Sequence, residues 1–123
     1  MSKIKSVSDA VKLIPDNAIL AVNSSSGLCC PDFILKALGE RFDTEQHPKN
    51  LTAIHPIAAG DMFGSPGTEH IAKPGMLKKI IGGSYISGPT KAEPPKIWQM
   101  ITSNQLAAYN VPSGIIFDML REG

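Results

Sequence analysis

The sequence predicts an α/β fold in which a parallel sheet is flanked by helices. Short apolar segments with strand character alternate along the chain with segments whose apolar residues recur at helical spacing. Residues 17–31 also lead from an apolar strand through a loop of small residues into a helix, which is where α/β proteins bind ligands. A chain of 123 residues has room for one domain, which we expect to span 1–123.

A short helix and a strand open the predicted order of elements. Either Ser6 or Ser8 can cap a helix that continues through Leu13, because a hydroxyl there accepts a hydrogen bond from a free backbone amide. The Pro-Asp-Asn sequence at 15–17 then turns the chain. An apolar strand is expected over 17–22.

The longest predicted helix follows the loop of small residues. It begins at Pro31, where the missing amide costs little in a first turn, and continues to about Thr44. A second buried strand is expected over 51–58, with Pro56 at its exit. The apolar residues at helical spacing in the helix are Phe33, Ile34, Ala37, Leu38 and Phe42.

The second half of the chain continues the alternation. A glycine-rich loop over 60–75 holds a helical turn near 69–72. A short helix over 76–81 is then expected to pass into a strand at Gly82-Gly83. The remaining predicted elements are a loop over 89–95, a helix over 96–103 with Ile97, Met100 and Ile101 inward, a strand over 106–110 and a helix from 112 to 121, giving the order βαβαβα.

Three loops are expected to meet at the carboxyl edge of the sheet, namely 23–31, 57–74 and 110–114, with Gly82-Gly83 as a fourth contributor. Small residues in the first loop let a ligand approach the backbone closely. The helix that follows offers unpaired N–H groups and a positive dipole end. Anionic or carbonyl groups are the expected guests.

Composition argues against several functional classes. Hydrophobic residues make up 42% of the chain and charged residues 19%, and the net charge is +1, so nucleic-acid binding is not expected. No stretch approaches the roughly 18 to 20 apolar residues of a membrane span, and the first residues lack the apolar core of a signal peptide. We therefore expect a cytoplasmic location and no membrane contact.

The cysteines and histidines do not form a recognisable metal site. Cys29 and Cys30 are adjacent, which disfavours a disulfide between them. Small buried thiols that fill a tight strand-to-helix junction are the main interpretation, and a reactive thiol near the helix N-terminus is the alternative. His47, His55 and His70 lie far apart, so neither a metal nor another cofactor is expected.

An ordered series of motifs resembles the amino-terminal part of the family I coenzyme A transferases, which include succinyl-CoA:3-oxoacid and acetate or propionate CoA-transferases. The family pattern around the first loop is roughly V-x-G-x-G-G-x-G-x-P-E, and Val22, Gly27, Pro31 and Asp32 match it. Further matches are Pro48-Lys49-Asn50-Leu51-Thr52, Gly60-Asp61, His70-Ile71-Ala72, Gly75-Met76-Leu77-Lys78-Lys79, Ile81-Gly82-Gly83 and Ala108-Tyr109-Asn110-Val111-Pro112.

The resemblance implies a partial CoA-transferase domain of the NagB/RpiA-like type. Such enzymes move coenzyme A between an acyl-CoA and a carboxylic acid through a glutamyl-CoA intermediate, so acyl-CoA and a carboxylate are the implied ligands and coenzyme A is a substrate. The implied oxyanion and CoA loop comprises Ser24, Ser25, Ser26 and Gly27. The implied substrate pocket comprises Gly60, Asp61, Gly82, Gly83, Tyr109, Asn110, Pro112 and Ser113.

The sequence departs from the family pattern in two ways. Ser24, Ser26 and Cys29 stand where the family prefers glycine, so a positive φ there would cost about 1 kcal/mol or more at each position. Ser84 and Ser113 stand where a histidine and a glutamine are usual.

The catalytic residue that the resemblance implies is missing from the matched motifs. The family's nucleophilic glutamate lies outside the matched part, and no acidic residue here falls in that motif, so no catalytic residue is assigned in this chain. The expected partner is the remainder of the transferase or a β subunit, or else a second copy of the chain.

Two other interpretations remain open. A noncatalytic relative would keep the fold for assembly or small-ligand binding, and the run Ser24-Ser25-Ser26 motivates this alternative. A relative of the sugar-phosphate isomerases would use the same loop of small residues to hold a phosphate.

Overall fold

The computed structural model describes residues 3–61, 64–86 and 93–123. Its described residues form one sheet of four strands in the order β1-β2-β3-β4, and every neighbouring pair is parallel. The strands are β1 (Ile19–Ala21), β2 (Leu51–His55), β3 (Leu77–Gly82) and β4 (Ala107–Asn110). The helices are α1 (Val7–Val11), α2 (Asp32–Glu45), α3 (Lys96–Thr102) and α4 (Ser113–Glu122), with a 3-10 turn η1 (Gly67–His70). The predicted α/β fold with a parallel sheet is confirmed.

The predicted helix over 76–81 is wrong, because Leu77–Gly82 is the strand β3, paired with β2 on one side and β4 on the other. A short apolar run fits a buried helix or a buried strand equally well, and only its neighbours decide. The connection from β2 to β3 therefore carries η1 and no α-helix among the described residues. Of the predicted loop over 89–95, residues 89–92 lie outside the described residues, and 93–95 precede α3.

The longest helix is confirmed, and only some of its apolar residues at helical spacing are buried. Leu35, Leu38, Gly39 and Phe42 are the buried residues of α2. Phe33, the first of the apolar residues at helical spacing, is 69% exposed. It stands two positions before Leu35, so the helical repeat turns it to the opposite side. Ile34 lies near the helix start and is also exposed.

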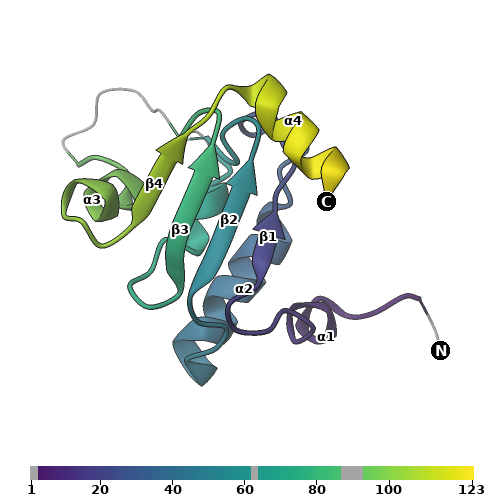
Figure 1. Ribbon diagram of the computed structural model, residues 1–123. Coiled ribbons are helices and arrows are strands. Elements are labelled where there is room, and N and C mark those ends of the chain that lie inside the picture. The colour runs from purple at the N-terminus through teal and green to yellow at the C-terminus, as the bar shows by residue number, and fades with distance from the viewer. Residues whose placement is uncertain (1–2, 62–63, 87–92) are drawn as a thin grey trace.

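The hydrophobic core lies between α2 and one face of the sheet. Figure 1 shows α2 behind the strands and α4 starting at the edge to which all four arrows point. The core-facing row of residues across the strands is Leu20, Ala53, Ile80 and Ala108.

The next row faces the opposite side of the sheet, because side chains alternate along a strand. We call this side the open face; its row is Ala21, Ile54, Ile81 and Tyr109, of which Ile54 is only 9% exposed, and Ile19 lies on the same side. Among the described elements, no helix covers the middle of it in Figure 1. Ile19 is 71% exposed and Tyr109 53%.

Candidate functional site

The loops after β1 and β2 are joined at the carboxyl edge of the sheet. The amide of Ser26 donates to the carbonyl of Ala58 at 2.9 Å, and the amide of Gly60 donates to the carbonyl of Ser26 at 2.9 Å. Ser26 and Ala59 form an isolated parallel bridge. The predicted convergence of these two loops is confirmed.

The segments after β3 and β4 meet the same edge. The amide of Val111 donates to the carbonyl of Gly82 at 3.0 Å. The hydroxyl of Ser113, at the start of α4, donates to the carbonyl of Pro56 at 2.6 Å. All four predicted contributors therefore come together, through backbone groups and short side chains.

Two glycines at the strand ends allow this close packing. A Cβ on Gly83 would overlap the carbonyl oxygen of Pro56 and the hydroxyl of Ser113. A Cβ on Gly82 would lie 2.5 Å from Cε1 of His55. Gly82 and Gly83 were predicted as pocket residues, and the structure shows that they also let β2, β3 and α4 approach one another.

The loop of small residues is a tight turn. Ser25 and Leu28 exchange two backbone hydrogen bonds of 3.0 Å each. Of the two central residues only Ser26 has a positive φ, of 55°, which is the pattern of a type II′ turn that ordinarily has glycine at this position. Cys29 also has a positive φ, of 56°.

The condition for backbone strain, a positive φ, is therefore met at Ser26 and Cys29 and not at Ser24. Ser24 is buried, and its hydroxyl donates to the carbonyl of Ala58 at 3.2 Å. A side chain at position 24 thus has a structural use that glycine would not provide.

The backbone amides of this turn differ in availability. Those of Ser25 and Ser26 donate to the carbonyls of Leu28 and Ala58. The amide of Gly27 donates to no backbone carbonyl within the described part of the chain. A Cβ on Gly27 would overlap the carboxylate of Asp61, so glycine is required for the close approach of these two loops. Gly27 is therefore the residue of the turn whose N–H is not paired with the backbone, and the carboxylate of Asp61 lies beside it.

The two acidic residues of the matched motifs have internal partners. Asp61 accepts hydrogen bonds from the amides of Gly64, at 2.9 Å, and Ser65, at 3.3 Å, and so shapes its own loop. Asp32, the first residue of α2, accepts from the amide of Gly67 at 2.6 Å and lies 3.3 Å from Nε2 of His70. Its carboxylate thereby holds η1 against the start of α2.

Asp32→Asn is expected to lower the free energy of unfolding at pH 7 by about 1–2 kcal/mol, because a charged hydrogen-bond acceptor is lost. Partial burial raises the pKa of Asp32, but the Gly67 hydrogen bond and the His70 contact outweigh it, so the net pKa lies below its usual value. A carboxyl whose pKa is lowered by folding stabilises the fold fully above its unfolded pKa of about 3.9 and loses that contribution as the pH falls through the folded pKa. Urea unfolding at pH 7, 4 and 2.5 should show the difference between wild type and variant shrinking with acidification.

The matched control is Asp118→Asn, whose carboxylate is paired with Arg121 on the exposed surface of α4. It should change stability by less than about 0.5 kcal/mol at each pH. A gap between wild type and Asp32→Asn that persists unchanged at pH 2.5 would contradict the role assigned to the Asp32 carboxylate.

The remaining predicted pocket residues lie at the end of β4. Tyr109 and Asn110 are exposed, and Pro112 directly precedes α4. The carbonyl of Tyr109 accepts a hydrogen bond of 2.7 Å from the hydroxyl of Tyr85. The centroid of the Tyr109 ring lies 5.9 Å from Nζ of Lys79, in the geometry of a weak cation–π contact.

His55 is the residue of this edge that the sequence-based prediction missed. It ends β2, is only 1% exposed, and neither ring nitrogen has a hydrogen-bond partner of good geometry among the described residues. Burial lowers its pKa to about 4, so the imidazole is neutral at pH 7. The signal in the sequence was a lone histidine at the carboxyl end of a buried strand, directly before the proline that ends it.

The cysteines divide between the two interpretations. Cys30 is partly buried, and burial raises the pKa of its thiol, which fits packing rather than nucleophilic reactivity. Cys29 is exposed, so the prediction of a buried thiol is wrong there. The described ranges contain no group of three or more His, Cys, Asp or Glu residues arranged to hold a metal ion.

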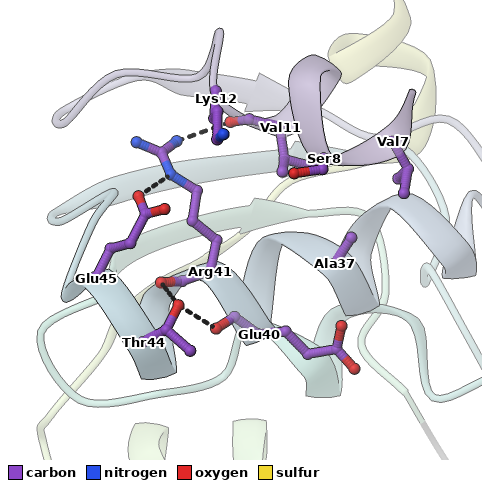
Figure 2. Close-up of a pocket in the computed structure, with 9 residues that line it drawn as sticks. All are labelled: Val7, Ser8, Val11, Lys12, Ala37, Glu40, Arg41, Thr44 and Glu45. Atoms are coloured by element: carbon purple, nitrogen blue, oxygen red, sulfur yellow. Dashed lines mark hydrogen bonds and ion pairs between the residues drawn. The ribbon is translucent and has the colours of Figure 1, made fainter. Parts of the chain in front are cut away.

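A hollow of about 270 Å³ lies away from this edge, between α1 and α2 (Figure 2). Arg41 spans it: Nη1 donates to the carbonyls of Val11, at 2.7 Å, and Ile14, at 3.0 Å, while Nε contacts Glu45 at 2.9 Å. These contacts fasten α1 to α2, and the hollow is best explained as the seam between the two helices.

Comparison with known proteins gives a consistent result. The chain is 29% identical over 119 residues to the acetate CoA-transferase YdiF of Escherichia coli K12. This aligned region covers 96% of this chain and 21% of the relative. It is 25% identical over 126 residues to the caffeate CoA-transferase of Acetobacterium woodii, covering 99% of this chain and 22% of the relative. No protein-family model matches the sequence.

Solved structures agree with these relatives. The E. coli O157:H7 acyl-CoA transferase YdiF, in a thioester complex with CoA, superposes with a TM-score of 0.79 and 28% identity over 95% of this chain and 23% of that protein. A variant of the decarboxylase AibA/AibB, at 21% identity and a TM-score of 0.58, shares the fold. The predicted resemblance to CoA-transferases is therefore confirmed, and the chain spans about a fifth of the length of the curated relatives that it matches. Among the described residues, no helix is long and apolar enough to cross a membrane.

Proposed function

We propose that this chain supplies the oxyanion and CoA loop, together with part of the substrate pocket, of an enzyme that transfers coenzyme A between an acyl-CoA and a carboxylate. The turn 25–28 is the proposed loop, and the strand ends around Gly82, Gly83 and Asn110 are part of the proposed pocket. Coenzyme A acts as a substrate. The nucleophilic glutamate comes from outside the matched motifs, as in the family that the sequence resembles.

The observation that carries the proposal is the tight turn of small residues at the binding edge, in a chain similar to CoA-transferases over nearly its whole length. In the proposed reaction a glutamate carboxylate attacks the thioester carbon, the carbonyl π electrons move to the oxygen, and CoA leaves as its thiolate when the carbonyl reforms. The CoA thiolate then attacks the glutamyl carbonyl of the anhydride and releases the first carboxylate. The N–H of Gly27, which no backbone carbonyl of the described residues accepts, is suited to donate to an oxygen that becomes negative during these steps.

Coenzyme A is expected to protect the protein from unfolding, whereas ribose 5-phosphate is not. A ligand present at 100 times its dissociation constant stabilises the folded state by about 2.7 kcal/mol. Thermal unfolding of the protein alone, with CoA and with ribose 5-phosphate measures both effects. Protection by the sugar phosphate without protection by CoA would contradict the proposal and favour an isomerase relative.

A noncatalytic relative is the second candidate, and a specific observation favours it. Ser26 and Cys29 adopt positive φ values, and the hydroxyls of Ser84 and Ser113 are used in contacts with the loop after β2. If the chain is a noncatalytic relative, both the wild type and Ser26→Gly would be inactive even with a glutamate-bearing partner, whereas activity in either form would count against this candidate. Ser26→Gly is the informative change because Ser24 is absent from the positive-φ positions.

We also propose a protein partner that covers the open face of the sheet. Parallel sheets are normally buried on both faces. The open face leaves Ile19 and Tyr109 exposed, and α4 beside it exposes four apolar residues, namely Ile115, Phe117, Met119 and Leu120. Polypeptide corresponding to the remainder of the longer relatives, or a β subunit that contains it, is the proposed occupant, with self-association as the alternative.

A further inference from the structure

His55 stands apart from the other buried polar side chains of the described chain. Ser24 and Thr68 are also buried, but each donates its hydroxyl proton to a backbone carbonyl, that of Ala58 or Ala59, at 3.2 Å. Within the described residues neither nitrogen of His55 has a hydrogen-bond partner of good geometry, although backbone groups of Ile57 and of His55 itself lie close enough to raise its pKa against the larger effect of burial. Leaving a buried polar group unpaired is costly, so its presence in a native fold requires an explanation.

The place of His55 in the fold connects it with the binding edge. It is the last residue of β2, in register with Gly82 of β3, which in turn is in register with Asn110 of β4. The Nδ1–Cε1 side of its ring occupies the space that a side chain at position 82 would need. Pro56, the next residue, accepts the hydrogen bond of Ser113.

The hydroxyls of the two residues that follow Gly83 are engaged elsewhere. The hydroxyl of Tyr85 donates to the carbonyl of Tyr109, and the hydroxyl oxygen of Ser84 accepts from the amide of Ala58 at 2.9 Å. The ring of Tyr85 packs edge-on against the imidazole with 5.8 Å between centroids, and it is itself partly exposed. A guest that displaces this phenol ring would therefore reach His55.

The chemistry of the imidazole defines the guest. A neutral imidazole offers one N–H donor and one lone pair, and no charge. Its N–H matches an uncharged carbonyl oxygen or one oxygen of a small carboxylate, and both occur among the ligands proposed above.

We propose that His55 is a ligand-binding residue of this edge: with the ring of Tyr85 displaced, its imidazole N–H donates a hydrogen bond to a carbonyl or carboxylate oxygen of the acyl group. This inference rests on the proposed function for the identity of the acyl-CoA. It explains why a buried histidine without partners stands at the carboxyl end of a central strand.

The test compares wild type with His55→Leu and His55→Gln by calorimetric titration with acetyl-CoA, CoA and acetate. His55→Leu should weaken acetyl-CoA and acetate binding by about tenfold and leave CoA, which has no acyl oxygen, unchanged. His55→Gln keeps an N–H donor and should lose less affinity. Thr68→Val is the matched control, since it removes a buried polar group with a partner and should leave acetyl-CoA affinity unchanged.

Stability provides an independent readout. His55→Leu removes two unpaired buried nitrogens, so the ligand-free variant should unfold at a temperature no lower than wild type, whereas Thr68→Val should unfold earlier. If His55→Leu does not fold, the test uses the wild-type protein instead, and the NMR signals of the His55 ring nitrogens are followed during the titration. They should shift when acetyl-CoA is added and stay in place when CoA is added.

Each outcome decides between the two proposals. The role of His55 would be overturned if wild type and His55→Leu bound acetyl-CoA with equal affinity, or if the His55 ring nitrogen resonances did not shift when acetyl-CoA was added. Either result would leave the CoA-transfer proposal standing. Binding of acetate but not CoA, with acetate weakened in His55→Leu, would overturn the CoA-transfer proposal and retain this one. A wild-type protein that binds none of the three probes would overturn both.

Discussion

Gly67→Ala is expected to destabilise the fold by about 3 kcal/mol. Gly67 has a φ of 57°, and a Cβ there would lie 2.5 Å from the carbonyl carbon of Ala59 and 2.6 Å from Cα of Gly60. The left-handed conformation costs a residue with a side chain about 1–2 kcal/mol, and forcing an atom into packed backbone typically costs about 1–3 kcal/mol more. The amide of Gly67 also donates to Asp32, so any shift of this backbone weakens the bond that holds η1 to α2.

Urea denaturation of Gly67→Ala beside Gly64→Ala measures this effect. Gly64 lies in the same loop, has open space around its Cα and has no positive φ, so its alanine variant should stay within about 0.5 kcal/mol of wild type. Equal stability of the two variants would show that the packing of η1 against the loop after β2 is not as described.

Gly83→Ala is expected to destabilise the fold by about 2–3 kcal/mol and to reduce the protection given by CoA. An added Cβ would overlap the carbonyl of Pro56 and the hydroxyl of Ser113, so the exit of β2 and the start of α4 must separate. That movement would break the 2.6 Å hydrogen bond between Ser113 and Pro56 at the centre of the proposed pocket. Thermal unfolding with and without CoA measures both consequences.

Gly114→Ala is the matched control for this prediction. Gly114 is in the first turn of α4 with open space around it, and alanine favours a helix over glycine by up to about 1 kcal/mol. It should therefore be as stable as wild type or slightly more stable, with CoA protection unchanged. A Gly83→Ala variant that matches it in both readouts would contradict the close packing inferred at this edge.

Gly39 shows how local propensity and packing can disagree. A glycine inside a helix usually weakens it. In α2, however, a Cβ at position 39 would overlap the carbonyl of His70, and the carbonyl of Gly39 accepts a hydrogen bond of 3.1 Å from Nζ of Lys73. The helix tolerates the glycine because η1 packs against it, which no feature of the helix sequence alone reveals.

The candidate site was predictable in its parts but not in its contacts. Motif order placed Gly27, Gly82 and Gly83 at the binding edge, since the carboxyl ends of parallel strands share one edge. Which amides of the turn pair with backbone carbonyls depends in part on how the loop after β2 lies against it, since the amide of Ser26 donates to Ala58, more than thirty positions away. The isolation of His55 likewise depends on Tyr85 and Ser84 being engaged elsewhere.

The sequence by itself determined the alternation of elements, the longest helix and the loops that meet at the binding edge, because periodicity, proline and glycine act locally. Only the tertiary structure decided that Leu77–Gly82 is a strand. An apolar run of that length fits a helix or a strand, and here it pairs with β2 on one side and β4 on the other. It also decided that Ser26 rather than Ser24 adopts a positive φ and that His55 has no partner. These features depend on contacts between residues far apart in the chain, and no local pattern encodes such contacts.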